Sequence, residues 1–176
     1  MVVWLMGLSR AGKTTIGREL YRQWKAKESN TVLIDGDEIR AIFQHDVDEF
    51  SYALDGRRKN ADRICEICAW LDRQEINVVC CILSIFEESR QWNRINLSEY
   101  FEVYIEVAFD LLINRDDGRL YNPALRGELK NVVNVDIPFH EPDNPDYIFN
   151  NSEPREDFSG VAAEILQRAK EKFSKL

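Results

Sequence analysis

Short apolar runs alternate along the chain with longer stretches in which apolar residues recur at helical spacing. The runs are rich in β-branched and aromatic side chains and stop at glycine or polar residues, which is typical of buried strands. This pattern predicts strands over Val2–Met6, Thr31–Ile34, Asn77–Leu83, Phe101–Val107 and Asp146–Phe149, and helices over residues 14–27, 56–73 and 152–172. Such alternation predicts an α/β fold in which a parallel sheet is flanked by helices on both faces, with ligands at the carboxyl ends of the strands.

One long stretch, residues 116–145, has no periodicity and is rich in Asp, Asn, Pro and Gly. A loop of this length in a compact domain is usually functional. We therefore expect a lid over the site, the alternative being a surface loop without a role.

Composition narrows the possible functions. The chain has 176 residues, 44% of them hydrophobic, which is enough for one domain with a substantial core. A net charge of −8 and a pI near 4.9 argue against a nucleic acid polymer as partner. No apolar run reaches the roughly 18 residues that cross a bilayer, so we expect a cytoplasmic protein without a membrane partner. The cysteines lack the ligand pairs of a zinc site, and we predict buried free thiols at Cys65, Cys68, Cys80 and Cys81.

The segment Gly7–Thr14 matches the phosphate-binding pattern G-x-x-x-x-G-K-[ST], directly after a predicted strand and at the start of a predicted helix. In such a loop, backbone N–H groups and the helix N-terminus bind phosphate oxygens, the lysine reaches the β and γ phosphates, and the hydroxyl binds Mg²⁺. No N-K-x-D or T-K-x-D motif for guanine follows, so ATP with magnesium is the expected donor. The predicted nucleotide-binding residues are Gly7, Ser9, Ala11, Gly12, Lys13, Thr14 and Thr15.

Two carboxylates follow the second predicted strand, at Asp35 and Asp37. Acids at a strand end can be plain turn or helix-cap residues. Beside a phosphate-binding loop, however, one carboxylate can hold magnesium and the other can orient and deprotonate an attacking hydroxyl. We assign Asp35, with Thr14, to the metal and Asp37 to the acceptor.

These segments together resemble the adenylylsulfate kinase family. The resemblance extends in order along nearly the whole chain, through Gly7–Thr14, Leu33–Arg40, Arg57 with Asn60 and Arg63, Leu83-Ser84, Arg115-Asp116, Leu120-Tyr121, Gly127–Lys130 and Asp136–Phe139. It implies one P-loop kinase domain over residues 1–176 with a lid at about 116–145. It also implies transfer of the ATP γ-phosphoryl group to the ribose 3′-hydroxyl of adenylyl sulfate, and a homodimer.

The resemblance also implies roles for single residues. Arg115 is expected to bind the nucleotide, and Asp35 to lie on the magnesium side. Ser84 matches a serine described in the family as a phosphorylated intermediate, and we expect direct transfer with Ser84 as a binding hydroxyl. The residues expected to contact the acceptor are Asp37, Arg40, Phe50, Arg57, Asn60, Leu83 and Ser84.

The chain departs from the family around the acceptor and in the lid. Ala61-Asp62 stands where the family has Ile-Arg, and two extra residues separate Phe50 from Arg57. Ile85-Phe86 follows Leu83-Ser84 where the family has Pro and an aromatic residue. The lid lysine of the family motif D-x-K-G-L-Y is replaced, and we expect Arg119 to supply the catalytic cation from the adjacent position.

The departure with the largest expected effect is Val132, which replaces the phenylalanine of the family motif F-T-G-I-D. That phenylalanine covers one face of the acceptor adenine while the aromatic residue matching Phe50 covers the other. When only one of the two aromatic rings remains, the base loses a stacking free energy of about 1 kcal/mol or more.

Several functions stay open at this point. One is an adenylylsulfate kinase with an altered base pocket. Another is a kinase of the same family with a different small nucleotide as acceptor, such as cytidine diphosphoramidate in capsule synthesis. A small-metabolite kinase on the same scaffold and a non-catalytic nucleotide-binding module are further alternatives; keeping Lys13, Thr14, Asp35 and Asp37 together argues against the module.

Overall fold

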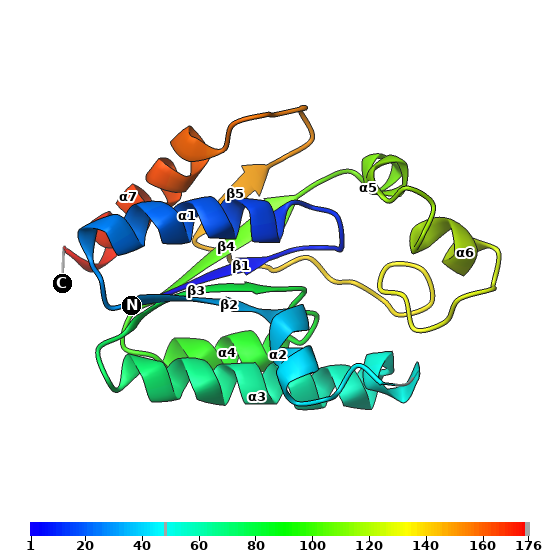
Figure 1. Cartoon of the computed structure of the whole chain (residues 1–176), viewed down its shortest axis with the longest axis horizontal. Helices are drawn as coiled ribbons and strands as arrows, with labels where there is room; N and C mark the ends of the chain where they lie inside the picture. The colour runs from blue at the N-terminus through cyan, green and yellow to red at the C-terminus, as the bar shows by residue number, and fades with distance from the viewer. Residues whose placement is uncertain (48, 175–176) are drawn as a thin grey trace.

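A five-stranded parallel sheet forms the centre of the computed structural model, which describes residues 1–47 and 49–174 (Figure 1). The strand order is β2-β3-β1-β4-β5. The central strand pairs on both sides, Val2 with Val78 and with Tyr100. The strands are β1 (Val2–Met6), β2 (Thr31–Asp35), β3 (Asn77–Ile82), β4 (Tyr100–Glu106) and β5 (Tyr147–Asn150).

Long helices cover both faces of the sheet (Figure 1). Helices α1 (Lys13–Lys27) and α7 (Ser159–Phe173) lie on one face, and α3 (Leu54–Asp72) and α4 (Glu87–Asn96) on the other. Alternate residues of β1 point to the two sides, so Val3 and Leu5 pack with α1 and α7 while Trp4 packs with α3. The predicted α/β class is confirmed.

Short helices surround the carboxyl ends of the strands. They are α2 (Gly36–Ile42), the 3₁₀ helix η1 (Glu49–Tyr52), α5 (Phe109–Arg115) and α6 (Tyr121–Leu125). Figure 1 shows α5, α6 and the segment that follows them reaching beyond the sheet on the side of the loop between β1 and α1. The expected lid therefore contains the helix α6, and the short helices were missed because one or two turns leave too little periodicity to detect.

The last helix starts later than the sequence predicted, at Ser159 rather than at residue 152. Asp157 explains the start, because its carboxylate accepts hydrogen bonds from the Ser159 N–H at 2.8 Å and from the Ser159 hydroxyl at 2.7 Å. Apolar spacing alone does not register these local hydrogen bonds directly before the helix.

The four cysteines are free and buried, as predicted. Among the helices of residues 1–47 and 49–174, none has the length and apolar character needed to cross a membrane.

Gly17 lets α1 approach β3 closely, so a side chain at this position is expected to destabilise the fold. A Cβ at Gly17 would overlap the Cys81 sulfur and lie 3.3 Å from Leu5 Cδ1, whereas one at Gly160 in α7 would meet nothing within 4 Å. We expect Gly17→Ala to lower the free energy of unfolding by about 1–3 kcal/mol. The control Gly160→Ala should raise it by up to about 1 kcal/mol. Urea titrations measure both, and equal effects would contradict the close approach.

Candidate active site

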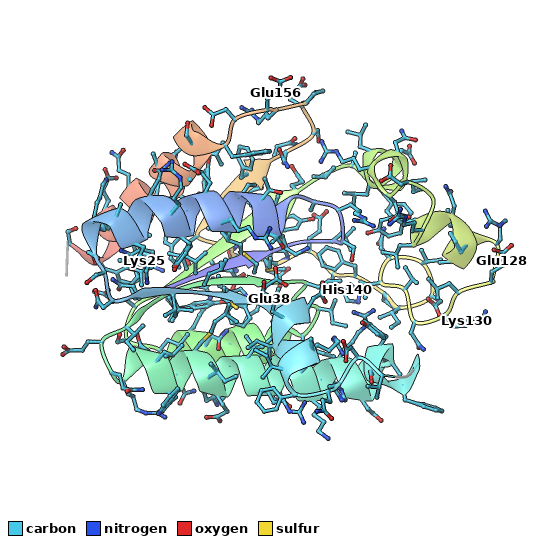
Figure 2. The ribbon with its side chains drawn as sticks, viewed as in Figure 1. Lys25, Glu38, Glu128, Lys130, His140 and Glu156 are labelled. Atoms are coloured by element: carbon cyan, nitrogen blue, oxygen red, sulfur yellow. The ribbon has the colours of Figure 1, made fainter. Side chains whose placement is uncertain are left out.

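A cavity of about 730 Å³ lies at the carboxyl ends of the strands, bounded by the β1–α1 loop, α2, α3, the end of β3 and the expected lid segment, residues 116–145. Figure 2 shows the side chains around this end of the sheet, with Glu38 projecting from α2. It also shows Glu128 and Lys130, part of the segment 127–130 of the family resemblance, at the outer end of the lid. The predicted site residues in the cavity wall are Ser9, Gly12, Lys13, Thr14, Thr15, Asp35, Asp37, Arg40, Arg57, Asn60, Leu83 and Arg119.

The β1–α1 loop, residues 7–12, has the backbone geometry of a phosphate cradle. Gly12, directly before α1, has a φ of 97°, a left-handed conformation that strains other residues. A Cβ there would also lie 2.7 Å from the Asn151 amide nitrogen. That amide donates a hydrogen bond to the Ala11 carbonyl at 2.9 Å, so Asn151, beyond the end of β5, supports the loop from behind.

Lys13 directly follows the loop, and its side chain turns back to contact the loop backbone. Its ammonium donates a hydrogen bond to the Leu8 carbonyl at 2.8 Å. Burial lowers the pKa of Lys13, and the charges of Asp37 and Asp35 oppose that shift. Burial raises the pKa of the Cys81 thiol to about 12, so this cavity-lining cysteine stays protonated at neutral pH. Lys13 is thus a half-buried basic residue of the cavity wall with carboxylates nearby.

Thr14 and the two carboxylates meet beside Lys13. The Thr14 hydroxyl donates to Asp35 Oδ2 at 2.7 Å, and the Asp37 N–H donates to Asp35 Oδ1 at 3.0 Å. Asp35 thereby also caps α2. Within the described residues the Asp37 carboxylate has no hydrogen bond, and it lines the cavity. Asp35 is held in place and Asp37 is available to a ligand.

Two arginines and a tyrosine form the opposite wall. The guanidinium carbons of Arg40 and Arg57 lie 4.7 and 5.8 Å from the Tyr52 ring centre. Arg57 donates hydrogen bonds to the Tyr52 and Asn131 carbonyls, both at 2.7 Å. Burial lowers the pKa of both arginines, which indicates a partly dehydrated, positively charged surface.

The structure does not bring Phe50 to this wall. Its side chain is 72% exposed, whereas Tyr52 lines the cavity. Tyr52 precedes Arg57 by five residues, so the two extra residues in this segment move the aromatic position from Phe50 to Tyr52. Counting back from Arg57 could have identified it.

Two further positions differ from expectation. Ser84 is buried outside the cavity wall, and its hydroxyl accepts a hydrogen bond from Trp4 Nε1 at 3.1 Å. Asp62 faces a separate groove between α3 and α4 with Arg58 and Glu88. Its charge therefore lies away from the loop and is not expected to act on the acceptor. Val132, by contrast, is 3% exposed and lines the cavity.

The start of the expected lid segment is joined to the β1–α1 loop. Arg10 Nε lies 3.0 Å from Asp116 Oδ1, and Asp116 Oδ2 accepts from the N–H groups of Leu120 and Tyr121 at 2.5 and 2.9 Å. Burial acts to raise the pKa of Asp116, but these hydrogen bonds and Arg10 outweigh it and lower that pKa. Arg115 lies behind the cavity wall and donates to the Asn151 carbonyl at 2.8 Å.

Sequence reasoning missed several residues of the site: Arg10, Tyr52, Leu120 and Asn151. For Arg10 a signal existed, because a basic residue inside a phosphate-binding loop is chemically conspicuous. For Asn151 there was none, since only the fold brings it to the loop.

Known proteins of two kinds are similar to this chain. The cytidine diphosphoramidate kinase of Campylobacter jejuni is 40% identical over 86% of this chain and 86% of its own length. The adenylyl-sulfate kinase of Halothermothrix orenii is 31% identical over 98% of this chain and 90% of its own length.

Solved structures share the fold. The adenylylsulfate kinase CysC of Mycobacterium tuberculosis, in complex with AMPPNP and APS, superposes with a TM-score of 0.80 at 23% identity and covers 96% of both chains. The family model described as adenylylsulphate kinase matches residues 1–150. The chain therefore belongs to the adenylylsulphate kinase family and is an ATP-dependent phosphotransferase of that type.

Proposed function

We propose that this kinase transfers the γ-phosphoryl group of ATP to the ribose 3′-hydroxyl of a small pyrimidine nucleotide of the cytidine diphosphoramidate kind. The choice of acceptor is supported by the side chains of the cavity wall, which offer one aromatic face and one aliphatic face. Tyr52 supplies one aromatic face there, and Val132 supplies an aliphatic face where the family has a second aromatic ring. A single aromatic wall is better matched to a small pyrimidine than to an adenine. The likeness to the Campylobacter jejuni kinase supports the same choice.

The charges of the cavity fit an acceptor with an anionic diphosphate part. Arg40 and Arg57 lie against Tyr52 and both line the cavity, so an aromatic base and an adjacent anion can be bound together. Asn60 lines the same wall and donates to the Gly36 carbonyl at 3.2 Å, which fixes its amide group.

The proposed reaction is an in-line displacement at the γ-phosphorus. Asp37 receives the proton of the acceptor hydroxyl as that oxygen forms a bond to phosphorus, and the bond to the β-phosphate oxygen breaks to release ADP. Lys13 and, from the lid, Arg119 neutralise the charge that develops on the transferred group. The lid, residues 116–145, is proposed to exclude water during transfer.

Thr14 and Asp35 would hold the magnesium ion. Their oxygens lie 2.7 Å apart at the cavity wall, and oxygen ligands are those that Mg²⁺ prefers. In the part of the chain that the structure describes, no group of three or more His, Cys, Asp or Glu side chains could hold a metal. This fits Mg²⁺, which commonly takes one or two protein ligands and completes its shell with phosphates and water. Bound there, magnesium would neutralise phosphate charge.

Adenylyl sulfate is the second candidate acceptor, because the family model and several relatives carry that activity in their names. ADP release with cytidine diphosphoramidate, adenylyl sulfate and simple sugars or polyols separates the candidates. We expect cytidine diphosphoramidate to give the highest kcat/KM. Adenylyl sulfate turned over with the higher kcat/KM would overturn the pyrimidine proposal, and turnover of sugars alone would overturn the nucleotide acceptor. The expected homodimer stays a prediction.

Val132 is predicted to control the choice of base. Val132→Phe should raise kcat/KM for adenylyl sulfate about ten-fold, because an added aromatic face is worth on the order of 1 kcal/mol or more. Steady-state kinetics with both acceptors measure the change.

Val132→Leu is the matched control, because it adds apolar volume without a ring and should not produce this gain. Val132 is buried, so both variants are expected to lose some stability by overpacking, which thermal unfolding monitors. A folded Val132→Phe enzyme with no gain for adenylyl sulfate would place base recognition elsewhere.

A further inference from the structure

Arg10 has a backbone conformation that a non-glycine residue rarely adopts. It is the fourth residue of the β1–α1 loop, residues 7–12, and has a φ of 67°. An L-residue in this left-handed region is strained, and such strain persists where the surroundings impose it, often at functional sites. Glycine would fit this position without strain, so the arginine side chain must be accounted for by what it contacts.

The guanidinium of Arg10 is held by one edge only. Its Nε pairs with Asp116 Oδ1 at 3.0 Å, and the Asp116 side chain is fully buried while that of Arg10 is 45% exposed. Among the described residues, the two terminal nitrogens of Arg10 have no hydrogen-bond partner. Since Arg10 lines the same cavity as Lys13, these unpaired donors are available to a ligand there.

Asp116 is itself rigidly placed. Its second carboxylate oxygen accepts from Leu120 and Tyr121 at the start of α6, and the Tyr121 hydroxyl donates to the Ser9 carbonyl at 2.9 Å. The ion pair therefore sits between two hydrogen-bonded segments, the tip of the loop and the base of the lid. An arginine so oriented presents a preorganised fork of N–H donors, the geometry that suits a phosphate oxygen pair.

We propose that Arg10 is a second catalytic cation that contacts the terminal phosphate of the bound nucleoside triphosphate beside Lys13, and that Asp116 is the positioning residue that orients it. During transfer the negative charge spreads over the three non-bridging oxygens of the phosphoryl group, and one lysine cannot contact them all. The proposal rests on phosphoryl transfer alone and holds for any acceptor.

The test begins with Arg10→Gly, which removes the guanidinium and relieves the backbone. We expect kcat to fall about 10²–10³-fold with the best acceptor of the panel, because one preorganised donor contributes about that much. Calorimetric binding needs no acceptor, and affinity for AMPPNP should fall about ten-fold more than affinity for ADP, which lacks the terminal phosphate. Glu75→Gly is the matched control: Glu75 has a φ of 59° on an exposed turn far along the chain from the loop, so this variant relieves similar strain and should keep wild-type kcat.

The Asp116 half of the proposal is tested by a double-mutant cycle. Asp116→Asn should lower kcat about ten-fold, and adding it to Arg10→Gly should lower kcat no further, because its effect passes through the arginine. Additive losses would overturn the positioning role. An Arg10→Gly enzyme with kcat within three-fold of wild type, or with equal losses of AMPPNP and ADP affinity, would overturn the contact with the terminal phosphate. A failed acceptor assignment would alter neither binding result.

Discussion

Lys13→Ala is expected to lower kcat about 10³-fold or more while the protein keeps its fold. Lys13 carries a positive charge inside the phosphate-binding loop, and its loss leaves the developing charge of the transferred group without its main neutralising partner. Burial lowers the pKa of Lys13, which means that burial disfavours the charged form and that the charge adds little to folding stability. ADP release measures turnover, and thermal unfolding checks the fold.

Lys27→Ala provides the control for this experiment. Lys27 lies in the last turn of the same helix and is exposed, so the variant removes an equal charge far from the cavity and should turn over like wild type. A folded Lys13→Ala enzyme that kept kcat within ten-fold of wild type would show that phosphate charge is neutralised mainly by other residues.

Asp37→Asn is expected to lower kcat by about 10²–10⁴-fold with little change in ATP affinity. The proposed role of Asp37 is to take a proton from the acceptor hydroxyl, and general-base catalysis contributes about this factor. ATP should still bind, because the loop, Lys13 and the Thr14–Asp35 pair are left in place. The measurements are kcat with saturating substrates and a calorimetric dissociation constant for AMPPNP.

Glu38→Gln is the matched control, since Glu38 follows Asp37 in α2 but lies outside the cavity wall, where it faces Arg18 at 3.9 Å. This variant should keep wild-type kinetics. If Asp37→Asn instead abolished nucleotide binding and left kcat nearly intact, Asp37 would have to be reassigned to the magnesium shell.

The sequence predicted the sheet, and it predicted residues that the structure brings together at one cavity, for a physical reason. Buried parallel strands are short apolar runs, and the phosphate-binding loop is a contiguous motif whose spacing is fixed by its own backbone. Five strands, three long helices and the position of Lys13, Thr14, Asp35 and Asp37 at one cavity follow from such local information. The ten-residue helix α4 (Glu87–Asn96) was not predicted, and the start of α7 was placed too early along the chain.

The acceptor side was harder to predict because its geometry depends on contacts between distant segments. An insertion shifts which aromatic residue faces the cavity, so Tyr52 lies there and Phe50 does not. Ser84 follows an apolar strand as expected, but its φ of 59° and the bond from Trp4 keep its hydroxyl out of the cavity wall. The shift to Tyr52 could have been found by counting back from Arg57, whereas the placement of the Ser84 hydroxyl has no signature in the residue pattern of its own segment.

The contact between Asn151 and the Ala11 carbonyl spans 140 positions of the chain. Synthesis runs from the N-terminus, so the phosphate-binding loop leaves the ribosome before the other site residues and its supporting amide leaves it after them. A nascent chain carrying every residue of the loop would therefore hold it without this support until β5 has joined the edge of the sheet. The loop therefore gains this support only after β5 and Asn151 have been synthesised and have folded onto the sheet.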